Sequence, residues 1–171
     1  MTGKPLVGEE AGDQAGRVSG AGDVDGDGLH DLLVGAPGDD EAASNAGAAY
    51  VVLGPVTGTL DLSLADAKLV GEETRDFAGY SVSGAEDVDG DGHDDLLVGA
   101  YYNDEGRSEA GAAYLVLGPV TGTLDLSLAD AKLVGEERRD GAGYGVSGGG
   151  DVDADGHDDL LVGAYGAGAY L

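Results

Sequence analysis

One nine-residue pattern of aspartates and glycine occurs three times in this chain of 171 residues. The middle copy reads Asp87-Val88-Asp89-Gly90-Asp91-Gly92-His93-Asp94-Asp95, and the copies begin 64 residues apart at Asp23, Asp87 and Asp151. Each copy has carboxylates at positions 1, 3, 5 and 9 and a glycine at position 6. Calcium is a hard cation that takes about six to eight oxygen ligands, and alternate aspartates followed by a glycine let a short chain curl around it. The pattern therefore predicts three calcium ions per chain.

The expected ligands are the four carboxylates of each copy and the backbone carbonyl at position 7, with a water to complete the shell. They are Asp23, Asp25, Asp27, Leu29 and Asp31; Asp87, Asp89, Asp91, His93 and Asp95; and Asp151, Asp153, Asp155, His157 and Asp159. An EF-hand is excluded because its twelfth position is a bidentate glutamate. This chain has Val34, Val98 and Val162 at that position.

The alternative is a turn rich in Asp and Gly that binds no ion, because both residue types are common in turns. Two carboxylates about 4 Å apart repel each other by ~1 kcal/mol in water and by ~4 kcal/mol at an effective dielectric constant of about 20. A curled loop holds several such pairs, so without a cation the loop should open. Three copies in fixed register favour the ion-binding interpretation.

Short apolar runs, typical of strands covered on both faces, follow the three loops. They span residues 32–34, 96–98 and 160–162, and each is closed by Gly-Ala. Strands of small residues lead into the loops, and further strands are expected at 49–53 and 113–117. A fourth strand with the sequence Lys-Leu-Val-Gly-Glu-Glu begins at Lys68 and at Lys132, and a related segment begins at Lys4.

A 64-residue repeat with four strands predicts an all-β fold of β-propeller blades, each made of four antiparallel strands. We expect blade 1 at residues 11–73, blade 2 at 74–137, and a split blade 3 formed by 138–171 together with 1–10. The connector at 54–64 is repeated unchanged from Gly118. Its alternating leucines favour an outer extended edge.

The composition narrows the classes of function. The formal charge is −26, from 34 acidic and 8 basic residues, which excludes nucleic acid as a partner because phosphates would be repelled. No apolar run approaches the length of a membrane span, and Met1-Thr2-Gly3-Lys4 does not begin a signal peptide. Calcium loops of this kind usually have the weak affinity suited to extracellular calcium, so we expect an extracellular or cell-surface location.

The repeats resemble the FG-GAP repeat of integrin alpha-subunit β-propellers and their bacterial relatives over nearly the whole chain. The shared features are the Gly-x-x-Val strand that begins at Gly79, the Asp-x-Asp-x-Asp-Gly-x-x-Asp loop, the Gly-Ala-Pro element at Gly35, and the Gly-Ala-Ala-Tyr strands at Gly47 and Gly111. The resemblance implies calcium on one face of the propeller, bound by the loop aspartates. The family's Phe-Gly is Ala-Gly in every repeat here, and its proline is present only at Pro37.

Propellers of this family close with about seven blades, whereas this chain has three repeats. The pattern predicts twelve strands: one at the N-terminus, then four, four and three. The N-terminal strand could therefore serve as the fourth strand beside Tyr170. Because strand edges invite pairing, a second copy of the chain could close a six-bladed ring, as a homodimer. The alternative is an open piece of a longer propeller.

No residues form an arrangement that predicts catalysis, so we do not expect an enzyme. His30, His93 and His157 lie inside the loops and are expected to be exposed. Asp61 and Asp125 are interpreted as turn caps, and the scattered arginines as solvated charges. Five tyrosines are expected to pack in the core or a central channel, with a ligand-binding face as the alternative: Tyr80, Tyr101, Tyr102, Tyr144 and Tyr165.

Two functions remain open from the sequence. The first is a calcium-stabilised propeller that serves as a structural or adhesion-like binding module for an unidentified protein or glycan. The second is a self-assembling repeat protein, natural or engineered, because residues 54–73 are identical to 118–137.

Overall fold

The body of the protein contains one sheet for each repeat, in which the strands of that repeat are antiparallel to their neighbours, and the computed structural model describes residues 6–166 and 168–170. The first sheet contains β2 (Arg17–Gly22), β3 (Asp31–Ala36), β4 (Ala48–Val52) and β6 (Ala67–Val70). The second contains β7 (Ser81–Glu86), β8 (Asp95–Ala100), β9 (Ala112–Val116) and β11 (Ala131–Val134). The third contains β12 (Ala142–Gly150), β13 (Asp159–Ala164) and β14 (Gly168–Tyr170).

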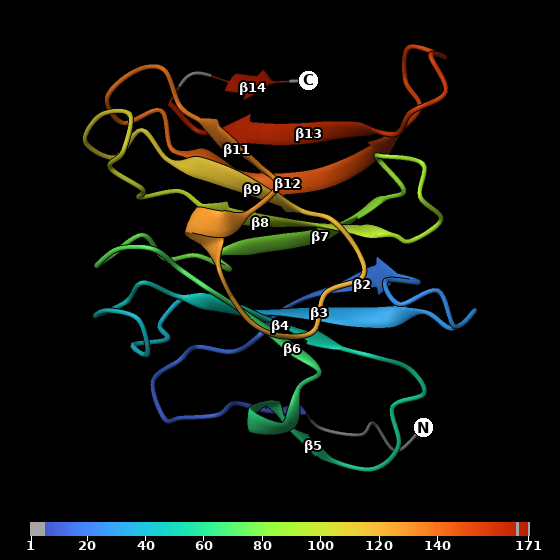
Figure 1. Ribbon diagram of the computed structural model, residues 1–171. Coiled ribbons are helices and arrows are strands. Elements are labelled where there is room, and N and C mark those ends of the chain that lie inside the picture. Colours follow the sequence, from blue (N-terminus) through green and yellow to red (C-terminus); the bar gives the residue numbers. More distant parts are fainter. Residues whose placement is uncertain (1–5, 167, 171) are drawn as a thin grey trace.

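The sheets are stacked one above another in chain order (Figure 1). The predicted all-β fold of four-stranded propeller blades is confirmed by blades 1 and 2, and blade 3 has three strands within the described residues. The exact blade boundaries and the joining of residues 1–10 to blade 3 stay predictions, and residues 1–5 lie outside the described part of the chain.

The connectors join each blade to the one before it. They form β5 (Leu60–Asp61) and η1 (Leu62–Leu64) in blade 1, and β10 (Gly122–Asp125) and η2 (Leu126–Leu128) in blade 2. β10 runs parallel to β6 of blade 1, and β5 runs parallel to β1 (Leu6–Val7). The twelve predicted strands are all present, and β5 and β10 bring the strands among the described residues to fourteen.

The predicted cap at the start of each connector helix is confirmed. The Asp61 carboxylate accepts a hydrogen bond from the Ser63 amide at 3.0 Å, and Asp125 does the same with Ser127 at 2.9 Å. This capping fixes η1 and η2 so that their first leucine faces the core. Leu62 is therefore 1% exposed, whereas Leu64, two residues later, is 71% exposed.

The core lies between the sheets because the strands are covered on both faces. Every residue of β4, β8 and β9 is buried, as the continuous apolar runs predict. Gly35 in β3 allows the close approach of the next blade, since a β-carbon there would lie 2.0 Å from the Gly79 carbonyl oxygen. Gly99 in β8 does the same for blade 3, with 2.1 Å to the Gly143 oxygen. The glycine after the apolar run is thus a packing requirement in blades 1 and 2, whereas a β-carbon at Gly163 of blade 3 would lie no closer than 3.3 Å to another atom.

The described residues contain no helix that is long and apolar enough to cross a membrane.

Candidate metal sites

The three aspartate loops join the first and second strands of the blades. Loop 1 (residues 23–31) lies between β2 and β3, loop 2 (87–95) between β7 and β8, and loop 3 (151–159) between β12 and β13. All three loops lie at the same edge of the stacked sheets, on the right in Figure 1. Each is preceded by a shift in strand register, a bulge next to the loop's ninth residue.

A glycine turns the backbone at position 6 of each loop. Gly28, Gly92 and Gly156 have φ of +87°, +95° and +97°, in the left-handed region that a β-carbon disfavours. A β-carbon at any of the three would meet no atom within 4 Å. The glycine is therefore required by the backbone conformation and not by crowding, as the spacing predicts.

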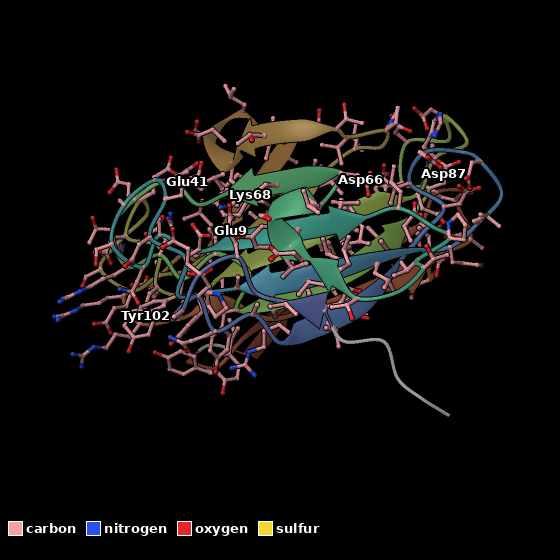
Figure 2. The ribbon with its side chains drawn as sticks, turned by 90° about the horizontal axis from the view of Figure 1, so that it is seen from below. Glu9, Glu41, Asp66, Lys68, Asp87 and Tyr102 are labelled. Atoms are coloured by element: carbon pink, nitrogen blue, oxygen red, sulfur yellow. The ribbon has the colours of Figure 1, made fainter. Side chains whose placement is uncertain are left out.

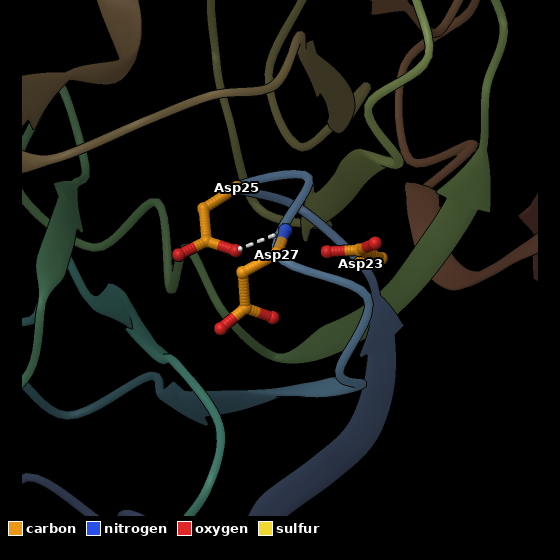
Figure 3. Close-up of side chains that lie close together, drawn as sticks. All are labelled: Asp23, Asp25 and Asp27. Atoms are coloured by element: carbon orange, nitrogen blue, oxygen red, sulfur yellow. Dashed lines mark hydrogen bonds between the residues drawn. The ribbon is translucent and has the colours of Figure 1, made fainter.

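Backbone amides hold the carboxylates of loop 1 toward the inside of the curl. Asp23 Oδ2 accepts from the Gly28 amide at 2.9 Å, and Asp27 Oδ1 accepts from Leu29 at 2.8 Å. Asp25 Oδ1 accepts from the Asp27 amide at 3.1 Å, which is the dashed line in Figure 3. Loop 2 repeats this arrangement, with Asp87 Oδ2 accepting from Gly92 at 2.9 Å. The carboxylates are thus oriented by the fold of the loop.

Each loop brings three carboxylates together, with one oxygen from each lying within 4.8 Å of the other two. The groups are Asp23, Asp25 and Asp27; Asp87, Asp89 and Asp95; and Asp151, Asp153 and Asp159. The predicted side-chain ligands Asp31, Asp91 and Asp155 lie outside these groups. They stay predictions, as do the carbonyl ligands at Leu29, His93 and His157.

The aspartate at position 9 also ties the loop to the end of its blade's third strand. In loop 1, Asp31 is 1% exposed and accepts from the amides of Val24 at 2.9 Å and Gly54 at 2.8 Å. Asp95 accepts from Val88 and Gly118, both at 2.9 Å. Burial raises the pKa of Asp95 from its ordinary value, although the two amides act against it. This residue has a structural role that the ion-loop pattern alone did not reveal.

The residues present fit a hard cation. Of the ion pairs found in the described residues, none joins a lysine or arginine to a loop aspartate. Asp23 Oδ1 is buried and has no hydrogen-bond partner among the described residues. A buried charged oxygen without a partner is costly, and a divalent cation bound by oxygen would satisfy it.

The environments of the three loops differ. The valine at position 2 is fully buried in loop 1 (Val24, 0% exposed), half-buried in loop 2 (Val88) and 56% exposed in loop 3 (Val152). His30 and His157 are exposed as predicted, but the prediction is wrong for His93. Its ring lies against Gly26 of loop 1, where a β-carbon would come within 2.8 Å of the ring, and its Nδ1 atom is buried.

Sequence reasoning missed a lysine-centred group of acids between the blades. Lys68 Nζ lies 2.8 Å from Glu9 and 3.0 Å from Asp39, and also contacts Glu41, as Figure 2 shows for the labelled side chains. Lys132 repeats the arrangement with Glu72, at 2.6 Å, and Glu105. The recurring sequence Lys-Leu-Val-Gly-Glu-Glu, which contains both the lysine and acidic residues, was the feature of the sequence that could have indicated these ion pairs.

The pKa values of these two lysines are set by opposing effects. Burial alone would lower the pKa of Lys68, but hydrogen bonds to Glu41, Glu9 and Asp39 outweigh it and raise the pKa above its ordinary value. The pKa of Lys132 is raised for the same reason, by Glu105 and Glu72. Both lysines therefore stay charged, and each stabilises the contact between one blade and the next.

The five tyrosines predicted to pack in the core instead form a cluster of aromatic rings, none of them fully buried, at the other end of the molecule from Asp87 (Figure 2). Ring centroids lie 4.2 Å apart for Tyr80 and Tyr101 and 5.5 Å apart for Tyr144 and Tyr165. The Arg17 guanidinium lies 4.8 Å from the centroid of the Tyr80 ring and adds a cation–π contact to the cluster. Tyr144 and Tyr165 remain 46% and 55% exposed.

Comparisons with known proteins agree with this architecture. The family model for the FG-GAP repeat matches residues 7–52 and 78–116, which include loops 1 and 2. Integrin alpha-IIb from Mus musculus is 35% identical over 95% of the chain, and the protein of the same name from Homo sapiens is 34% identical over 95%. The chain belongs to the FG-GAP repeat family.

Drosophila melanogaster integrin alpha-PS2 is a further relative of this FG-GAP protein, 32% identical over 94% of the chain. The chain spans only 16% of the length of either integrin alpha-IIb and 12% of integrin alpha-PS2. The similarity thus concerns an integrin alpha-like β-propeller segment.

Proposed function

We propose that this FG-GAP protein binds one calcium ion in each of loops 1, 2 and 3, and that the ions stabilise the blades without taking part in catalysis. The observation that carries the proposal is loop 1, where three carboxylate oxygens converge while Asp23 Oδ1 is buried without a partner. The repetition of the converging carboxylates in loops 2 and 3 supports it.

The chemistry is electrostatic. Three convergent carboxylates oppose folding by mutual repulsion unless a cation offsets their charge. The twelve aspartates predicted as ligands contribute −12 to the chain's net charge of −26, and three calcium ions would return +6. An ion bound by the folded loop and not by the unfolded chain stabilises the fold by about 2.7 kcal/mol at a hundredfold excess over its dissociation constant. Three sites, each at such an excess, would give roughly 8 kcal/mol.

Calorimetry and thermal unfolding test this proposal together. Titration with CaCl2 should show three ions per chain, and excess chelator should lower the melting temperature steeply. Asp89→Ala should remove one ion, whereas the matched control Asp61→Ala, a helix cap outside the loops, should leave three. A melting temperature and stoichiometry indifferent to calcium would reject the proposal.

We infer that the finished propeller acts as an adhesion-like binding module at an extracellular location, and not as an enzyme. The family and the integrin relatives support this inference, and a protein or glycan is the expected ligand. The aromatic cluster offers partly exposed rings at the face opposite the loops. If ligand binding persists in Tyr165→Ala, the aromatic face has no role in it. If binding persists in chelator, the calcium ions have no role in it.

Self-association is the second candidate function, and the position of β1 favours it. Leu6 pairs with Leu60 and Val7 with Asp61, the register in which Leu69 and Val70 of β6 pair with Leu124 and Asp125 of β10. β1 therefore occupies the place of a fourth strand of a blade preceding blade 1.

At the other end, β14 pairs with β13 on one side and has no fourth strand beside it within the described residues. We propose that β1 of a second copy pairs with this edge, giving a homodimer with six blades. Light scattering in calcium should give twice the chain mass of 16.9 kDa, and chelator should reduce it. A monomer in calcium would reject the homodimer and favour completion by further blades of a longer polypeptide.

A further inference from the structure

Loops 1 and 2 are joined by a reciprocal pair of hydrogen bonds, which we name the Asp94–Asp23 clasp. The Asp94 amide donates to the Asp23 backbone carbonyl at 3.0 Å, and the Asp23 amide donates to Asp94 Oδ2 at 2.7 Å. Asp23 is the first carboxylate of loop 1, and Asp94 is the eighth residue of loop 2. One residue of loop 2 therefore fixes the backbone on both sides of the first predicted ligand of loop 1.

The clasp depends on a missing side chain in blade 1. Gly22 precedes loop 1 with φ of +82°, and a β-carbon at Gly22 would lie 2.0 Å from Asp94 Oδ2. The Asp94 carboxylate thus occupies the space that a side chain would fill. The His93 ring packs against Gly26 beside it, so the contact between the two loops extends beyond the two hydrogen bonds.

Loops 2 and 3 have the same acidic residues without the clasp. Asp158 corresponds to Asp94, Asp87 to Asp23, and Glu86 to Gly22, as the strand registers Gly22↔Asp31 and Glu86↔Asp95 show. Across the described part of the chain, no hydrogen bond joins loop 2 to loop 3. Glu86 has φ of +61°, in the same left-handed region as Gly22 at +82°, and it carries a β-carbon at the position where the absence of one at Gly22 leaves room for the Asp94 carboxylate.

We propose that Asp94 is a positioning residue that couples calcium binding in loops 1 and 2, while Glu86 keeps loop 3 independent. The proposal depends on calcium binding by the loops, as proposed above. An ion in loop 2 would hold the backbone around Asp94 through the predicted ligands on either side, His93 and Asp95. Asp94 would then hold Asp23 in place for the ion in loop 1.

The coupling is reciprocal because each ion lowers the entropic cost of ordering the residues that the other ion needs. The hydrogen bond from the Asp23 amide to the Asp94 carboxylate forms fully only when both loops are ordered. Its expected contribution corresponds to a change of about five- to tenfold in the calcium affinity of one loop when the other is filled. Without such a bond, loop 3 should fill at a calcium concentration that does not depend on loop 2.

Nitrogen-edited NMR during a CaCl2 titration can follow the loops separately, because each has its own turn glycine. The amide resonances of Gly28, Gly92 and Gly156 report loops 1, 2 and 3. In the unaltered protein, the Gly28 and Gly92 midpoints should coincide on a cooperative curve, and the Gly156 midpoint should be separate.

Asp94→Ala should abolish the shared cooperative curve, so that the Gly28 and Gly92 midpoints separate and both rise, by up to about five- to tenfold, because the coupling is reciprocal. The matched control Asp158→Ala removes the same charge from the same loop position and should leave Gly28 and Gly92 together. Asp94→Asn keeps an oxygen acceptor without the charge and should also keep them together. Glu86→Gly opens the space beside Asp158 and should bring Gly156 onto the curve of Gly92.

The outcomes separate the two proposals. If no glycine resonance responds to calcium, the proposed function fails. If all three respond but Asp94→Ala and Asp158→Ala shift their neighbouring loops equally, calcium binding stands and the coupling is rejected. If Asp94→Asn separates the midpoints as Asp94→Ala does, the effect comes from charge alone, and the clasp is rejected.

Discussion

The seam between blades 1 and 2 and the seam between blades 2 and 3 are built from nearly the same sequence, yet within the described residues only the first has hydrogen bonds that join its two loops. At the first seam, Val24 is buried and Asp94 binds Asp23 on both sides. At the second, Val88 is half-buried, and the loops make no hydrogen bond to each other within the described residues. The difference shows that a repeated ion loop acquires its local stability from the neighbouring blade and not only from its own residues.

The largest effect should come from truncating the valine at position 2 of the loops. Val24→Ala should destabilise the protein by about 2 kcal/mol, because this fully buried side chain belongs to the core shared with Val116 and Leu126. Val152→Ala should change stability by less than about 0.5 kcal/mol, since the side chain is exposed. Urea unfolding at fixed calcium measures both. Equal losses would show that the two loops are packed alike in solution.

A matched pair of glycine substitutions isolates the clasp from backbone strain. Gly22 and Gly150 both have positive φ, so alanine at either should cost about 1 kcal/mol. Only at Gly22 does the new β-carbon collide with Asp94, whereas at Gly150 no atom lies within 4 Å. Gly22→Ala should therefore cost about 1 kcal/mol more than Gly150→Ala. If the two substitutions are equivalent in urea unfolding, Asp94 does not occupy this space in solution.

The other end of the first seam should respond to pH through Asp76. Burial raises the pKa of Asp76 from 3.8 to about 6, against the hydrogen bond from Asn103 that lowers it. The folded protein thus binds this proton more tightly than the unfolded chain does, so its contribution to stability grows as the pH falls from about 6 towards 4 and is lost as the pH rises.

Asp76→Asn should remove this contribution. The unaltered protein should be more stable relative to the variant at pH 5 than at pH 7, that is, its free energy of unfolding should exceed that of the variant by more at pH 5. Carrying out both measurements in the same calcium concentration cancels the response of the loops. A relative stability that does not change with pH would show that Asp76 titrates normally.

The smallest effect should come from an exposed ion pair near the second seam. Arg107 and Glu137 lie 3.8 Å apart, and both side chains are largely exposed. Arg107→Ala should change stability by less than about 0.5 kcal/mol, because solvent and salt screen such pairs. A larger loss would mean that this seam is more closely packed than its loops indicate.

Sequence reasoning could predict the features that depend on local pattern. The period of 64 residues, the continuous apolar runs and the Gly-Ala after them were sufficient for three blades, because a strand buried on both faces needs apolar residues throughout. The turn glycines Gly28, Gly92 and Gly156 were predictable because they are required by their own positive φ angles and not by contacts with distant residues. The caps at Asp61 and Asp125 were local for the same reason.

Contacts between residues far apart in the sequence were not predictable from one repeat at a time. Lys68 binds Glu9 from a position 59 residues away, and Asp23 and Asp94 are 71 residues apart. Because the three loops have nearly the same sequence, His93 was predicted to be exposed like His30 and His157, whereas its ring lies against Gly26. The error arose because the environment of a loop residue depends on the blade stacked beside it.

The sequence by itself determined the blades, the turns of the loops and which oxygens could face an ion, because these follow from backbone conformation and burial within one repeat. Only the tertiary structure decided which loops are joined. Asp94 reaches the backbone of loop 1 beside Gly22, which has no β-carbon, whereas Glu86 stands at the corresponding position before loop 2. Whether a carboxylate fits there depends on atoms from two blades, which no pattern within one blade contains.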